Sequence, residues 1–179
     1  IDTHGLGLGF QMLGSKYTLT GDFQAFFNSP ISTDSGFLAA KIIAEFGFLG
    51  AYNPDRGIVP FERFFLGGDG LGSYSLDGRE VIALRGYPNQ SLSSIDGNAI
   101  YNKFSLELRY PITLKQLASI YALTFLEAGA AYDNFRSYNP FQLKRSAGVG
   151  LRIFMPAFGL LGIDFGYGFD PVLGGMQPN

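Results

Sequence analysis

Short segments of this chain alternate between apolar and polar residues with a period of two, and this alternation limits the fold more than any other feature. The clearest case is 102–110, where one residue set is apolar and the interleaved set is polar: Phe104, Leu106, Leu108 and Tyr110 against Lys103, Ser105, Glu107 and Arg109. Successive side chains of a β-strand point to opposite faces. The segment therefore predicts a strand with one apolar and one polar face.

The same alternation recurs along the chain and predicts an all-β fold. It is clear in 17–27, 38–48, 147–153 and 161–169 and weaker in 5–12. The segment 119–132 is apolar, but its alternation is blurred by Leu123 and Phe125. We therefore expect six or seven strands, joined by connections at 28–35, 53–98, 111–117, 133–142 and 156–159.

Composition places these strands in a membrane. Only 16% of residues are charged, 46% are hydrophobic and 16% are aromatic, whereas a soluble domain usually carries about a quarter charged residues. No run of roughly 18 apolar residues is present, so a transmembrane helix is excluded. Only helices and closed barrels satisfy their backbone groups in lipid. The sequence thus predicts an antiparallel transmembrane β-barrel, with apolar residues facing lipid and polar residues facing the lumen.

The connections predict an orientation. Transmembrane barrels pair short periplasmic turns with longer outer loops, so the long loop 53–98 is expected outside and the connections 28–35, 111–117 and 156–159 in the periplasm. Aromatics at strand ends are expected at the membrane interface: Tyr110, Tyr132, Tyr138 and Tyr167. The smallest membrane barrels have about eight strands. We therefore expect this chain to be part of a larger barrel that extends beyond both of its ends.

Several other classes of function are disfavoured. Net charge is −2 and the 13 basic residues are scattered, which gives no basic surface for nucleic acid. His4 is the single histidine, and the glycine runs at 5–9 and 68–72 lack the strand and helix that a phosphate loop requires. Asp55, Asp69 and Asp77 could bind calcium, but their spacing does not match the EF-hand pattern, which favours solvated acids. We expect no catalytic residue, metal or cofactor.

Two motifs in the long loop carry a resemblance to a known family. The first is Pro60-Phe61-Glu62-Arg63-Phe64-Phe65-Leu66-Gly67-Gly68, and the second is Leu84-Arg85-Gly86-Tyr87. The segments 105–111, 125–129 and 146–152 follow in the expected order. From residue 17 to residue 170 the chain resembles the end of the barrel of BamA-type outer-membrane assembly factors. A collinear match of this length is more specific than either motif alone.

The resemblance implies a function and a place in the cell. Residues 1–179 would form the C-terminal part of a sixteen-stranded barrel in the bacterial outer membrane, preceded by periplasmic POTRA domains. The protein would be a non-enzymatic insertase, with membrane lipid, unfolded outer-membrane proteins and accessory assembly subunits as partners. Alternatives in the same superfamily are a TamA-like or two-partner secretion pore and the barrel of a phospholipase fusion. A diffusion porin and a soluble lipocalin-like barrel are less consistent with the loop motif and the composition.

The resemblance also implies a contact inside the barrel. By position, Arg85 would meet Glu107 and Glu127 on the inner wall, and the alternation independently places Glu107 on the polar face. A guanidinium presents a planar fork of donors that suits carboxylates. Gly67, Gly68 and Gly86 would let the loop pass close to the wall. The simpler alternative is a solvated loop arginine and two unrelated carboxylates in the lumen.

Overall fold

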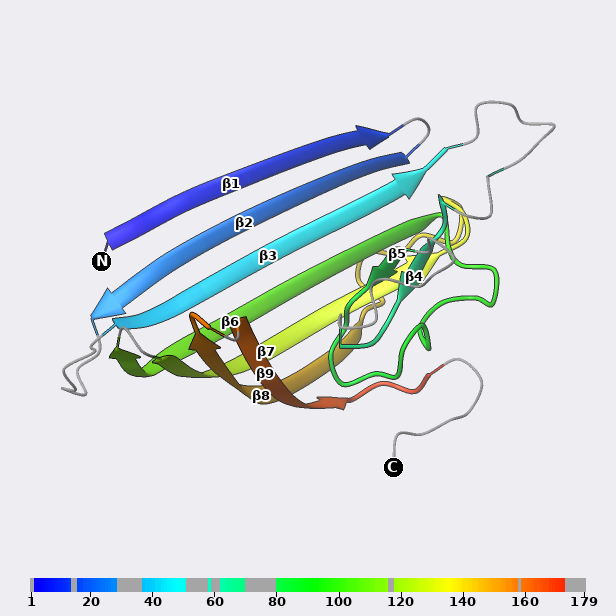
Figure 1. Ribbon diagram of the computed structural model, residues 1–179. Helices are drawn as coiled ribbons and strands as arrows, with labels where there is room; N and C mark the ends of the chain where they lie inside the picture. Colours follow the sequence, from blue (N-terminus) through cyan, green and yellow to red (C-terminus); the bar gives the residue numbers. More distant parts are fainter. Residues whose placement is uncertain are drawn as a thin grey trace.

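Seven long strands form one curved, antiparallel sheet (Figure 1). The computed structural model describes residues 2–13, 16–28, 37–50, 58, 62–69, 80–115, 118–157 and 159–172. The sheet order is β1-β2-β3-β6-β7-β8-β9. Its strands are β1 (Asp2–Leu13), β2 (Lys16–Asn28), β3 (Phe37–Leu49), β6 (Ile100–Lys115), β7 (Ala118–Tyr132), β8 (Lys144–Met155) and β9 (Gly159–Gly168). The expectation of an antiparallel β fold is confirmed, and the described strands do not close into a ring.

The two faces of the sheet differ in chemistry as the alternation predicts. We call the face covered by the long loop the inner face and the opposite one the outer face. On β6 the inner side chains Lys103, Ser105 and Glu107 are buried, while Phe104 and Leu108 on the outer face are 46% and 39% exposed. Antiparallel pairing carries this arrangement to the neighbouring strands. Their exposed outer side chains include Ile42, Leu126, Val149, Ile163 and Phe165.

The long loop is not structureless. It contains β4 (Phe64–Leu66) and β5 (Glu80–Ile82), which pair in parallel. Figure 1 shows both beside the right-hand end of the sheet, and β4 lies against β6 and β7. Phe64, Leu66 and Leu84 are completely buried, so the described apolar core lies between loop and inner face. The sequence did not predict β4 and β5, because three residues are too few to show a period.

One predicted connection is wrong. Residues 111–117 are expected to be a turn, but β6 continues through Pro111 to Lys115 and β7 begins at Ala118. The register between β6 and β7 shifts between Pro111 and Thr113. A bulge of this kind tolerates a proline, which has no N–H to give to the ladder. The connection between β6 and β7 is therefore shorter than the predicted turn at 111–117.

The other connections lie at the two ends of the sheet in the expected alternation (Figure 1). The loop between β3 and β6 and the segment 133–143 between β7 and β8 lie at one end. Strands β2, β6 and β8 end at the other. In the described part of the chain, no helix has the length and apolar character needed to cross a bilayer.

Candidate functional site: the loop arginine on the inner wall

Arg85 extends from the long loop onto the inner face and contacts Glu127 through both its backbone and its side chain. The backbone N–H donates to Glu127 Oε2 at 2.8 Å, and Nε and Nη2 donate to Oε1 at 2.9 and 2.6 Å. Nη2 also donates to Glu107 Oε2 at 3.1 Å. The Arg85 and Glu127 side chains are 11% and 3% exposed. The structure thus brings together the three residues that the resemblance names.

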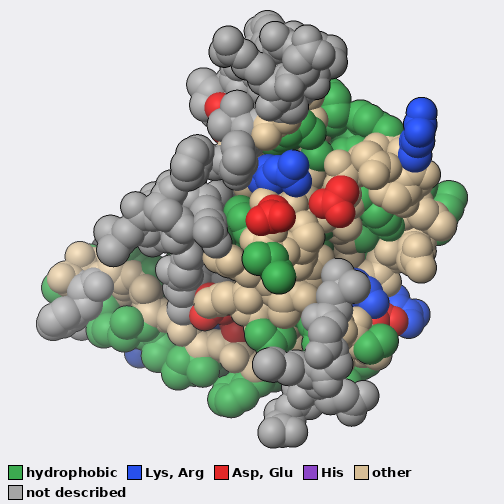
Figure 2. All heavy atoms as spheres, turned by 90° about the vertical axis from the view of Figure 1, so that its right-hand side faces the viewer, with side chains coloured by type: hydrophobic (Ala, Val, Ile, Leu, Met, Phe, Trp, Pro, Cys, Tyr) green, Lys and Arg blue, Asp and Glu red, His purple; other side chains and the backbone are tan. Residues whose placement is uncertain are grey.

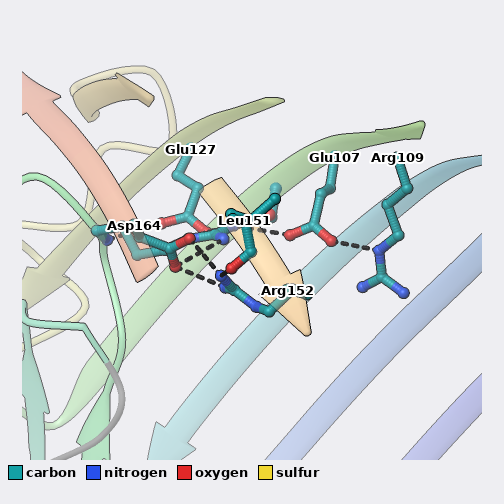
Figure 3. A network of polar contacts seen from close by, with 8 residues as sticks. Glu107, Arg109, Glu127, Leu151, Arg152 and Asp164 are labelled. Carbon is teal, nitrogen blue, oxygen red and sulfur yellow. Dashed lines mark hydrogen bonds and ion pairs between the residues drawn. The ribbon is translucent and has the colours of Figure 1, made fainter. Parts of the chain in front are cut away.

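The contact belongs to a larger network of arginines and carboxylates. Asp164 on β9 lies 3.5 Å from Arg85 Nη1 and forms two 2.6 Å hydrogen bonds with Arg152 on β8. Arg109 Nε donates to Glu107 at 2.5 Å. Figure 3 shows Glu107, Glu127 and Asp164 converging from three strands, with Arg109 beyond Glu107. Each of the three arginines contacts at least one carboxylate, so partners offset the cost of burying charge here.

The ring of Phe125 forms the floor of the site. The guanidinium carbon of Arg85 lies 3.8 Å from the ring centroid, which is a cation–π distance. Phe125 is 2% exposed and points inward on β7, two residues before Glu127. Burial alone would lower the pKa of Arg85, but the hydrogen bonds and charges of Glu127 and Glu107 reverse this and raise it. Arg85 is therefore a permanent cation in this site.

Two glycines allow the loop backbone to touch the wall. Gly86 has φ +92°, a conformation that side chains rarely adopt, and a Cβ there would lie 2.9 Å from the Tyr167 carbonyl carbon. On β9, a Cβ at Gly166 would lie 2.8 Å from the Gly86 nitrogen. Loop and wall are in contact at this point. Any side chain at either position would separate them.

Tyr87 joins the loop to the ends of β8 and β9. Its hydroxyl donates to the Arg145 carbonyl at 2.7 Å and accepts from the Asp170 N–H at 3.2 Å. Burial raises the pKa of Tyr87, so the phenol stays neutral and can donate. The Arg145 guanidinium holds the pKa of Asp170 below its usual range through a hydrogen bond. The tetrapeptide thus contacts the wall through Arg85, Gly86 and Tyr87.

The described part of the first motif holds the second in place. The Leu84 N–H donates to the Gly68 carbonyl at 3.0 Å, and the Gly67 N–H donates to the Ile82 carbonyl at 3.0 Å. Phe64 packs on Tyr101 of β6 with ring centroids 4.7 Å apart. Arg63 Nη1 donates to the Gly97 carbonyl at 3.1 Å. Pro60 and Phe61 lie outside the described residues. The two motifs therefore form one folded unit.

Of the three aspartates considered for calcium, the structure describes only Asp69. Asp55 and Asp77 lie outside the described residues, as does the side chain of His4. Asp69 lines a pocket of about 220 Å³ between loop and wall, together with Lys103 and Arg85. Among the residues that the structure describes, no group of three or more His, Cys, Asp or Glu side chains could hold a metal ion.

Sequence reasoning missed several members of the site. The alternation is blurred at Leu123 and Phe125 because both side chains are buried on the inner face of β7, and Phe125 lies beneath Arg85. Asp164 and Arg152 stand on the polar faces of two predicted strands, which is a signal for the lumen but not for a contact with Arg85. Their side chains meet because Gly150 is paired with Asp164 and Gly162 with Arg152. Glycines at those positions leave room for long side chains to cross.

The fold and site together define a class: a membrane β-sheet of barrel type whose polar inner face is covered by a long loop. A family model, that of the Omp85 superfamily domain, matches residues 6–172. The chain therefore belongs to the Omp85 superfamily. Its members are non-enzymatic insertases or translocases, and the barrel domain makes this an outer-membrane β-barrel protein. No curated protein matches the sequence at a significant level.

Proposed function

We propose that this chain is the C-terminal barrel region of a factor that inserts other β-barrel proteins into the outer membrane. Residues 53–98 would be an extracellular loop pinned inside the barrel by Arg85. Unfolded outer-membrane proteins would be the clients, and accessory assembly subunits would be further partners. An edge strand offers backbone hydrogen bonds to an incoming strand, which then need not bring unpaired groups into lipid.

One observation carries the proposal: the loop motif is held on the wall by a buried network of ion pairs. A simple pore needs an open lumen, whereas here Arg85, Gly86 and Tyr87 seat the loop against β7 and β9. A rigid loop at this place supports the strands that it touches. We expect it to keep the inner wall in shape while the barrel admits a client strand.

The test uses the full-length protein that contains this chain, reconstituted in liposomes. The client is a urea-unfolded outer-membrane β-barrel protein. Its folding is measured on SDS gels without boiling, where the folded barrel migrates differently from the unfolded chain. The parent protein is expected to accelerate client folding. Arg85→Ala is expected to slow it and to make the loop sensitive to protease, while the mutant barrel itself still folds. Lys115→Ala, which removes an exposed cation at the far end of β6, is the control and should behave like the parent.

Two results would contradict the proposal. If the parent exports a passenger polypeptide and does not accelerate client folding, the translocation pore of the same superfamily is the better assignment. If Arg85→Ala leaves the loop as protected as in the parent, the pinning role of Arg85 is wrong. A hydrolase module in the full-length protein would indicate the phospholipase fusion, in which catalysis lies outside this chain.

A further inference from the structure

The segment 133–143 between β7 and β8 folds across the outer face of the sheet. Tyr138 packs edge-on against Phe46 of β3 and Tyr132 of β7, with ring centroids 6.0 and 5.4 Å apart. Phe135 packs on Phe48 at 4.7 Å. The Tyr132 hydroxyl donates to the Asn139 carbonyl at 2.6 Å. Phe46 lies opposite Asn102 in the register and so shares the outer face with Phe104.

The length of β6 places this segment at a membrane boundary. On the outer face of β6, Ile112, Leu108 and Phe104 are exposed and apolar. The next residue on that face, toward the start of the strand, is the polar Asn102. A membrane strand needs about 9–11 residues to cross the apolar layer. Counted along β6 from Ile112, a span of this length ends at Asn102. Asn102 is paired with Phe46, the residue on which Tyr138 packs. The segment therefore lies where lipid gives way to water.

The segment presents large apolar side chains at this level. Phe141 is 91% exposed and Phe135 is 56% exposed. Figure 2 views the molecule from this end and shows hydrophobic side chains on the surface among charged ones. An exposed phenyl ring is unfavourable in water and favourable in the interfacial layer of a bilayer, where aromatic side chains concentrate. Through the contact of Phe135 with Phe48, these exposed rings adjoin the outer face of the sheet.

We infer that the segment 133–143 is a membrane-interface anchor, which inserts Phe141 and Phe135 among the lipid headgroups of the leaflet on the side of the long loop. Tyr138 and Tyr132 orient the segment by packing it on the barrel wall. The bilayer is the partner, recognised through exposed phenyl rings at the edge of the apolar band. This inference rests on the outer-membrane barrel and not on the insertase proposal.

The test places a fluorescent reporter at the tip of the segment. The chain contains no tryptophan, so Phe141→Trp in the full-length protein can be read as a difference from the parent. Ile95→Trp is the matched control, because Ile95 is 94% exposed but belongs to the long loop. Each protein is reconstituted in phosphatidylcholine–phosphatidylglycerol vesicles. Some of the vesicles contain lipids brominated near the headgroup or deep in the acyl chain.

We expect the Phe141→Trp emission to shift to the blue in vesicles and to be quenched more by shallow than by deep bromine. The control should remain open to a water-soluble quencher. Equal access of both variants to that quencher would overturn the inference. So would a blue-shifted reporter that bromine does not quench, since protein would then cover the ring. Should Phe141→Trp fail to fold, Phe135→Trp provides the same readout.

Discussion

Two segments at the same end of the sheet dock on opposite faces, and they use different chemistry to do so. The tetrapeptide of the long loop meets the inner face through charges: Arg85 contacts Glu127 and Glu107 in a site that is almost completely buried. The segment 133–143 meets the outer face through aromatic rings, with Tyr138 on Phe46.

The difference follows from the parity of the strands that receive each segment. Glu107 and Glu127 stand at inner positions of β6 and β7, while Phe46 and Tyr132 stand at outer positions of β3 and β7. One strand thus offers a carboxylate to one loop and an aromatic ring to another. A loop that carries an arginine matches the polar face, and a loop that carries tyrosine and phenylalanine matches the apolar face.

The largest expected effect comes from exchanging the charges of the inner contact. Arg85→Glu and Glu127→Arg each leave buried like charges together, and breaking a buried ion pair costs about 3–5 kcal/mol. Each single variant should release the long loop, measured as its rate of cleavage by protease in intact membranes. The double exchange should recover part of the protection. If the double variant is cleaved as fast as the faster single variant, the two residues are not coupled.

A methyl group on the wall should have the next largest effect. Gly166→Ala places a Cβ 2.8 Å from the loop nitrogen of Gly86, and overpacking of this kind costs about 1–3 kcal/mol. Gly159→Ala, at the far end of β9, is strained by its φ of +83° but has no atom within 4 Å of the added Cβ, so it perturbs β9 without touching the loop. Protease cleavage of the long loop should increase for Gly166→Ala alone. Equal cleavage of the two variants would show that the loop does not touch the wall at Gly86.

The outer contact should respond independently of the inner one. Tyr138→Ala removes two edge-on ring contacts, each worth about 0.5–1.5 kcal/mol beyond area burial. Hydrogen exchange in the segment 133–143 should accelerate, while protection of the long loop stays unchanged. Combined with Arg85→Ala, the effects on stability should add within about 0.5 kcal/mol. A larger departure from additivity would mean that the two docking modes form one cooperative unit.

The smallest expected effect is a dependence on pH next to Tyr87. Arg145 lowers the pKa of Asp170 from 3.8, so this contact stabilises the folded protein above that pH and the contribution is lost as pH falls through the lowered pKa. Because the Arg145 side chain is 66% exposed, the effect is screened by water and salt. Asp170→Asn should lower Tm slightly at neutral pH and not at strongly acidic pH. If the Tm difference between Asp170→Asn and the parent became larger as the pH falls, the stabilising contact between Arg145 and Asp170 would be contradicted.

Much of the fold follows from the sequence because period-two alternation is a local property. It predicts β6, β8 and β9 together with the faces of their side chains. The end of β6 could not be predicted, since Pro111 signals a turn locally while the shifted register against β7 accommodates it. The tertiary pairing decides such a boundary.

The site was only partly predictable, for a different reason. Alternation assigns Glu107 to the inner face, and the resemblance adds Arg85 and Glu127. Nothing in the sequence says that Asp164 and Phe125 also reach the same guanidinium, because residues on different strands meet according to register and sheet curvature. A side chain that breaks the polar pattern of an inner face, as Phe125 does, is the clearest signal that such a contact exists.

The most direct test of the whole account is the environment of successive side chains along β6. This chain has no cysteine, so residues 103–108 can be replaced one at a time by spin-labelled cysteine in the membrane-inserted, full-length protein, once any cysteine outside this chain has been replaced by serine. The account predicts that oxygen, which concentrates in lipid, reaches labels at Phe104, Leu106 and Leu108, while labels at Lys103, Ser105 and Glu107 are shielded from it. Oxygen accessibility without a period of two, or with its maxima at the odd positions, would contradict the central claim.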